Sequence, residues 1–80
     1  GGNGMKQEKL ASIRRSKNIS QREVADLLGV ATETYNNKEL GKTQFKANEM
    51  FLIADFFGKK IDEIFLPPNF MYREVKKKNA

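Results

Sequence analysis

The chain has 80 residues, of which 15 are Lys or Arg and 10 are Asp or Glu, so its formal net charge at pH 7 is +5. This length suffices for one small domain and is too short for two. The absence of cysteine excludes disulfides and thiolate metal sites, and the absence of histidine removes the commonest general base. The basic excess suits a polyanionic partner such as DNA, RNA or an anionic membrane surface.

The ends of the chain differ in composition from its middle. The segment 1–4, Gly-Gly-Asn-Gly, resembles the remnant of an expression tag, with Met5 as the native start. We expect one domain over 5–66 and a tail over 67–80, whose basic end, Lys76 to Lys78, is a disordered solvated segment. No apolar run reaches the length of about 18 residues that a membrane span needs, so we expect no membrane partner and a cytoplasmic location.

Two amphipathic helices are predicted over about 6–17 and 20–28. Their apolar residues recur at helical spacing: Leu10 and Ile13 in the first, and Val24, Leu27 and Leu28 in the second. Asn18 ends the first helix because asparagine tolerates the left-handed conformation. The second begins at a capping box, Ser20-Gln21-Arg22-Glu23, in which the hydroxyl and the carboxylate each bond a backbone amide, and Gly29 ends it.

A polar helix over about 32–40 follows after only Val30 and Ala31. Tyr35 and Leu40 are the few apolar residues that can anchor it. A capped apolar helix, a glycine turn and a second helix form the helix-turn-helix unit, in which the first helix lies on the core and the second projects. A polar second helix is expected if its outer face enters a groove lined with hydrogen-bond donors and acceptors.

Two more helices complete the predicted fold. The first covers about 47–57 and has apolar residues at i, i+3, i+4 and i+7: Met50, Ile53, Ala54 and Phe57. The second is short and holds Ile61, Ile64 and Phe65, and Pro67-Pro68 ends it. The pattern therefore predicts an all-α fold of five short helices around a single core, with a short C-terminal tail.

Three segments resemble the Cro/repressor (XRE-like) family of helix-turn-helix regulators. Residues 19–30, Ile-Ser-Gln-Arg-Glu-Val-Ala-Asp-Leu-Leu-Gly-Val, resemble its signature L-S-Q-E-E-L-A-x-x-L-G-V. Residues 39–42 are similar to its E-N-G-K loop, and residues 53–65 to its L-A-x-x-L-G-V-S-L-D-E-L-F ending. The resemblance implies a compact lambda-repressor-like domain and a sequence-specific, double-stranded DNA-binding transcriptional regulator from a phage or mobile element, with repression as the expected effect.

The resemblance also implies which side chains contact DNA. The start of the recognition helix reads base edges, which corresponds here to Thr32, Glu33 and Asn37, with Asn36 beside them. Positions 33 and 37 share a helix face, and Asn, Glu and Thr suit adenine, cytosine and the thymine methyl group respectively. Ala31 stands where Ser or Thr commonly caps this helix. If Thr32 caps it instead, its hydroxyl is occupied.

The expected phosphate contacts are Gln21, Arg14, Arg15, Lys38 and Lys42, together with the backbone amides near Gly41. Each side chain also has a structural interpretation. Gln21 is a good helix former, Lys42 can be an ordinary solvated lysine, and the two arginines can be a solvated face with one paired to a carboxylate. Glu33 can equally be a first-turn acid favoured by the helix dipole. Asn36 and Asn37 are poor helix formers, which favours a functional role for them.

Three residues depart from the family pattern. Lys38 occupies a position that is usually apolar, Leu40 stands where Asn is common, and Phe45 replaces a usual Pro. We interpret them as a subfamily variation that shifts the recognition helix without changing the fold.

The predicted fourth helix carries surplus apolar surface at Leu52 and Phe56, which are four residues apart, with Phe51 nearby. An exposed apolar pair of this kind indicates a covered surface. A second subunit can cover it, as in the two-fold dimer that a palindromic operator needs, or Phe70 and Tyr72 of the tail can fold back on it. We favour a homodimer that places two copies of the polar helix in successive major grooves, about 34 Å apart.

Other classes of function have less support. Without His or Cys only a Ser-Lys pair could supply a nucleophile and its base, and no glycine-rich phosphate loop is present, so we expect no enzyme, cofactor or metal site. The alternative is a protein-binding adaptor, antitoxin-like or anti-defence, that uses the surface at Leu52 and Phe56. RNA binding lacks the stacking aromatics on a sheet that RNA modules use.

Overall fold

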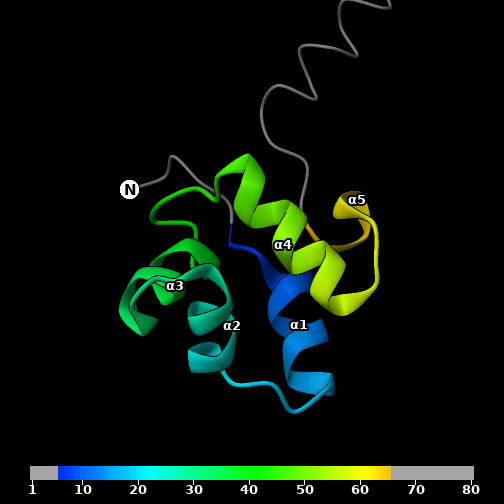
Figure 1. Cartoon of the computed structure of the whole chain (residues 1–80), viewed down its shortest axis with the longest axis horizontal. Helices are drawn as coiled ribbons and strands as arrows, with labels where there is room; N and C mark the ends of the chain where they lie inside the picture. Colours follow the sequence, from blue (N-terminus) through cyan, green and yellow to red (C-terminus); the bar gives the residue numbers. More distant parts are fainter. Residues whose placement is uncertain (1–5, 66–80) are drawn as a thin grey trace, which may run out of the picture.

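The computed structural model describes residues 6–65 and folds them into five helices without a strand (Figure 1). These are α1 (Glu8–Ser16), α2 (Gln21–Leu28), α3 (Thr32–Glu39), α4 (Ala47–Phe57) and α5 (Ile61–Ile64). The all-α, five-helix prediction is confirmed. The expected tag remnant, the basic tail end, Phe70 and Tyr72 lie outside the described residues. None of the helices in 6–65 has the length and apolarity needed to cross a membrane.

The helix ends follow the predicted local chemistry. Ser20 Oγ accepts the Glu23 N–H at 3.1 Å, and Glu23 Oε1 accepts the Ser20 N–H at 2.9 Å, which is the predicted capping box. Asn18 (φ 58°) and Gly29 (φ 74°) both adopt the left-handed conformation that turns the chain out of a helix. Ala31 is the N-cap of α3 and makes no side-chain cap, so the hydroxyl of Thr32 is not used for capping.

The core draws side chains from all five helices. Its fully buried residues of largest volume are Tyr35, Leu10, Ile53, Ile64 and Val24. Of the apolar stripe predicted in α2, only Val24 is fully buried, and Leu27 and Leu28 are half-buried. The other buried residue of this helix is Ala25. Helix α2 packs against α3 and α4, while α1 packs against α3 and α5, so the polar helix α3 rests on two others.

Phe45 links the loop after α3 to the core. Its ring meets Tyr35 edge-to-face with the centroids 5.9 Å apart, and Phe65 in the same manner at 5.2 Å. Offset aromatic contacts of this kind add stability beyond the apolar area they bury. The aromatic residue at position 45 therefore ties α3 to the chain that follows α5.

Candidate nucleic-acid interface

The outer face of α3 is polar and open to solvent. Thr32, Glu33 and Thr34 are exposed, and Asn36 and Asn37 are half-buried. With 3.6 residues per turn, Glu33 and Asn37 lie opposite the buried side of the helix. Figure 1 shows α3 at one side of the molecule, with α2 beneath it and α5 at the far side.

The inner face of α3 is held by a carboxylate. Glu39 Oε2 accepts from Arg14 Nε at 2.9 Å and from the Tyr35 hydroxyl at 2.7 Å, and Oε1 accepts from Gln21 Nε2 at 3.0 Å and Arg14 Nη2 at 3.3 Å. Burial by itself raises the pKa of Glu39, but the hydrogen bonds from Arg14, Tyr35 and Gln21 outweigh it and hold this pKa below its usual value. The cluster therefore contains an ionised carboxylate that joins α3 to α1 and α2.

A second buried ion pair joins α3 to α4. Lys38 Nζ lies 2.8 Å from Glu49 Oε1 and also donates to the Gln44 carbonyl oxygen at 3.4 Å. Burial raises the pKa of Glu49, and the hydrogen bonds from Lys38 and from the Lys46 backbone N–H lower it further than burial raises it. The usual apolar contact of position 38 is thus replaced by a charged one.

The structure revises three of the expected phosphate contacts. Arg14 and Lys38 are each 8% exposed, and their charges are paired with carboxylates inside the domain. The two N–H groups of Gln21 Nε2 point to Asn36 Oδ1 (2.9 Å) and to Glu39 Oε1, so this side chain has no donor left for a phosphate. Sequence reasoning treated these residues as surface groups because their partners lie far along the chain.

The loop after α3 presents a lysine rather than a row of free amides. The N–H of Gly41 donates to the Lys38 carbonyl at 3.1 Å, and the N–H of Lys42 donates to the Asn37 carbonyl at 2.9 Å. The amides expected to bind phosphate are therefore used to end α3. The side chains of Lys42 and of Arg15 are exposed, and neither forms an ion pair with another residue of 6–65.

An apolar face on α4, made of Phe51, Leu52 and Phe56, is open to solvent as predicted. These side chains are 64%, 43% and 45% exposed. The Phe56 ring contacts Phe57 edge-to-face, at 5.1 Å between centroids, but otherwise stands outside the core. This α4 apolar face is far more apolar than the outer face of α3.

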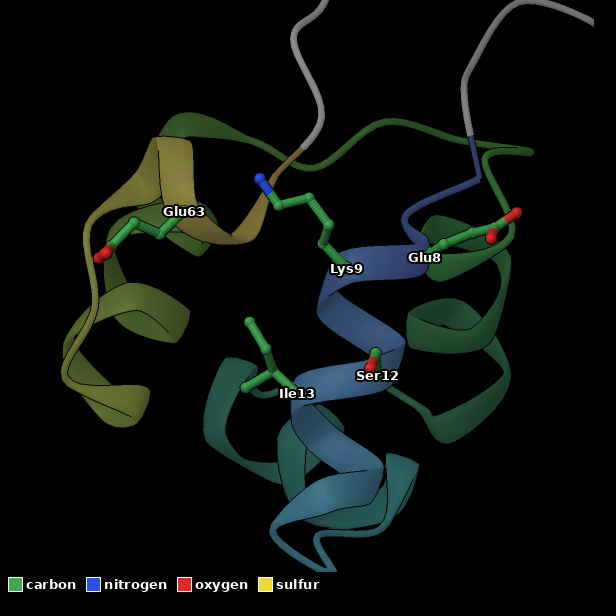
Figure 2. A pocket seen from close by; sticks show the side chains of 5 residues that line it. All are labelled: Glu8, Lys9, Ser12, Ile13 and Glu63. Atoms are coloured by element: carbon green, nitrogen blue, oxygen red, sulfur yellow. The ribbon is translucent and has the colours of Figure 1, made fainter.

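A shallow depression lies between α1 and α5 (Figure 2). Its lining consists of Glu8, Lys9, Ser12, Ile13 and Glu63. Lys9 reaches across it toward α5, where its Nζ donates to the Asp62 carbonyl oxygen at 3.3 Å. The two glutamates make the depression unsuited to a phosphate, so α3 remains the better candidate for contact with a polyanion.

The carboxylates of Glu39 and Glu49 are the site-forming residues that sequence reasoning missed. Both set the position of α3 without facing solvent. A signal for the first was present, since Tyr35 and Glu39 lie four residues apart on the side of a polar helix that must face the core. For Glu49 the signal was a lysine at a position expected to be apolar, because a buried cation requires a buried partner.

Comparison with known proteins finds helix-turn-helix transcriptional regulators. The helix-turn-helix family model HTH_3 matches residues 10–64. The HTH-type transcriptional regulator AnsR of Bacillus subtilis is 35% identical over 60 residues, which are 75% of this chain and 52% of AnsR, so the chain spans about half of that relative. An HTH-type transcriptional regulator of Methanocaldococcus jannaschii is 40% identical over 58 residues, 72% of this chain and 88% of the relative. The crystal structure of a transcriptional regulator from Listeria innocua has the same fold, with a TM-score of 0.70 and 19% identity over 96% of this chain and 78% of its own.

Proposed function

This chain belongs to the XRE-type helix-turn-helix family of transcriptional regulators, and we propose that it binds double-stranded DNA sequence-specifically by placing α3 in the major groove. The observation that carries the proposal is the division of α3 into two faces. Its inner side is fastened by Glu39 and Lys38, and its outer side presents Glu33 and Asn37 to solvent. A polar face on a firmly held helix is what base recognition requires.

The side chains at the start and on the outer face of α3 supply the sequence preference. Asn37 suits bidentate pairing with adenine, Glu33 can accept from the cytosine amino group, and Thr32 can contact a thymine methyl group. The hydroxyl of Thr32 does not cap α3, so the Thr32 side chain is available for this role. Arg15 and Lys42, which are exposed and unpaired among the described residues, supply phosphate contacts and salt dependence.

We propose further that the protein acts as a homodimeric repressor. The α4 apolar face is the candidate contact between the two copies, because an exposed group of two phenylalanines and a leucine is unfavourable in water. A two-fold dimer places two copies of α3 on two half-sites of a palindrome. Binding of such a dimer over a promoter would block polymerase.

Selection of bound duplexes from a randomised DNA library at physiological salt tests the proposal. The expected result is a two-fold symmetric site that Asn37→Ala blurs at one position in each half. Ser12→Ala is the control, because Ser12 is exposed on α1, away from both α3 and the α4 apolar face, and should leave the site unchanged. Weak, salt-sensitive binding without any enriched sequence would contradict the proposal.

The same α4 apolar face supports a second candidate function, a protein-binding adaptor of the antitoxin-like or anti-defence kind. In that case the face binds a different protein, and α3 has no sequence preference. The selection experiment separates the two functions, since only a regulator enriches a DNA sequence.

A further inference from the structure

The side-chain amide of Asn36 is oriented by a chain of hydrogen bonds that begins at the buried carboxylate of Glu39. Gln21 Nε2 donates to Glu39 Oε1 at 3.0 Å and to Asn36 Oδ1 at 2.9 Å. A carboxylate can only accept, so Gln21 must turn its nitrogen toward Glu39. The same nitrogen meets Asn36, so Asn36 must turn its oxygen toward Gln21.

This arrangement leaves Asn36 with one free polar group. Its Nδ2 carries two N–H donors, and no residue in 6–65 accepts from them. Asn36 is half-buried and lies beside the outer face of α3, next to the start of α2. At this point of the surface Asn36 itself therefore offers hydrogen-bond donors only.

We propose that Asn36 contacts the DNA only as a hydrogen-bond donor: it recognises an acceptor on the DNA and does not pair with adenine in the bidentate manner. The proposal rests on the DNA-binding function proposed above. Bidentate pairing with adenine needs both Oδ1 and Nδ2 turned to the base edge, and Oδ1 is turned to Gln21. The acceptor is an oxygen or N7 at a base edge, as in guanine, or a phosphate oxygen.

The neighbouring Asn37 provides the contrast. Its side-chain amide makes no hydrogen bond to another residue of 6–65, so both of its ends are free to pair with a base. Two adjacent asparagines thus have different recognition chemistry, and the difference originates in the core.

The buried cluster keeps this polarity constant. Arg14 and Tyr35 also donate to Glu39, so three residues form hydrogen bonds with the carboxylate and fix its orientation. The lowered pKa of Glu39 keeps it ionised, and therefore acceptor-only, at neutral pH. Gln21 is a positioning residue in this scheme, since it acts through Asn36.

The first part of the test exchanges the polarity at position 36. Asn36→Asp still accepts from Gln21 but turns an acceptor outward, so selection from a randomised library should move one position per half-site from guanine to cytosine. The expected change in the ratio of the two bases is about ten-fold, the size of one good base contact. If the natural acceptor is a phosphate, Asn36→Asp and the uncharged Asn36→Ala both lower affinity equally for all sequences and leave the selected site unchanged. Either result supports donor-only recognition and identifies its source.

The second part removes the group that orients Asn36. In Gln21→Met the side-chain amide of Asn36 can rotate. If Asn36 contacts a base, the base preference at that position should then widen to include adenine. If Asn36 contacts a phosphate, the contact should persist. Asn37→Asp is the matched control and should change the base preference at a different position of the selected site. Two results would overturn the inference. One is a wild-type site with an adenine preference that is lost in Asn36→Ala. The other is an Asn36→Asp variant that binds with the affinity and the base preference of the wild type.

A measurement on the free protein covers the case in which a variant does not fold. Hydrogen exchange followed by NMR should show slow exchange of the Gln21 side-chain NH2 and fast exchange of the Asn36 NH2. Slow exchange of the Asn36 NH2 would overturn the inference. If the wild-type protein selects no DNA site at all, the proposed function fails, whereas a selected site with the wrong polarity at position 36 defeats only the inference.

Discussion

Lys38 Nζ lies 2.8 Å from Glu49 Oε1, and the two side chains are only 9% and 8% exposed. This pair connects the inner face of α3 to the first turn of α4, where Glu49 also accepts the backbone N–H of Lys46, the N-cap residue. Helix α3 and the helix with the exposed apolar face are therefore linked through this charged contact. Its loss should affect the stability of the whole domain.

Lys38→Met should lower the free energy of unfolding by roughly 3–5 kcal/mol, because it leaves the buried Glu49 carboxylate without its cation. Lys38→Met combined with Glu49→Gln removes both charges and keeps a side-chain oxygen that can accept the Lys46 N–H, so it should recover most of the loss. Urea denaturation monitored by circular dichroism measures both. Equal instability of the single and double variants would show that the charge pairing is unimportant.

Acid should destabilise the domain through Glu39 and Glu49. The fold holds the pKa of both carboxyls below the value of about 4.3 that glutamate has in an unfolded chain. Their stabilising contribution is therefore complete above about pH 5 and is lost as the pH falls through the lower folded pKa values. Urea denaturation between pH 7 and pH 3 should show this decline.

The pH dependence can be assigned to a residue by substitution. Glu39→Gln cannot titrate at this position, so its stability should be lower at pH 7 but fall less steeply with acid than that of the wild type. Glu8→Gln, at an exposed residue that forms no ion pair within 6–65, is the matched control. An unchanged acid slope in Glu39→Gln would assign the acid sensitivity to other groups.

Lys42→Ala should weaken DNA binding to a similar degree for every sequence, because a phosphate contact carries no base information. The slope of log affinity against log salt should become shallower by about 0.9 for each phosphate contact removed. Fluorescence anisotropy over a salt series measures it. Lys59→Ala, in the exposed connection between α4 and α5, should leave the slope unchanged. A changed base preference in Lys42→Ala would contradict a phosphate role.

Substitution of both Leu52 and Phe56 by Glu should convert a dimer into a monomer and reduce binding to the symmetric site. The helices should stay folded, since both side chains are more than two-fifths exposed in the wild type. Sedimentation velocity and circular dichroism measure the two effects, and Ser12→Glu, at an exposed residue of α1, controls for added negative charge away from the α4 apolar face. If DNA binding persists while a different protein is lost from pull-downs, the adaptor function gains support.

Local sequence patterns were sufficient to predict the elements of this fold. The capping box at Ser20, the left-handed ends at Asn18 and Gly29, and the exposed pair Leu52 and Phe56 all appear in the structure as predicted. Each of these features depends on groups within about one or two helical turns of each other, so spacing along the chain determines it.

The roles of individual charged residues were decided only by the tertiary structure. Arg14 and Arg15 are adjacent and identical in type, yet Arg14 is buried against Glu39, 25 positions away, while Arg15 faces solvent. Lys38 differs from Lys42 in the same manner, through a carboxylate 11 positions along the chain. Whether a cation is neutralised depends on how two helices cross and which side chains meet there. That geometry has no counterpart in local spacing, so the sequence by itself determined the helices and their apolar faces, and packing decided which polar groups remain free to meet DNA.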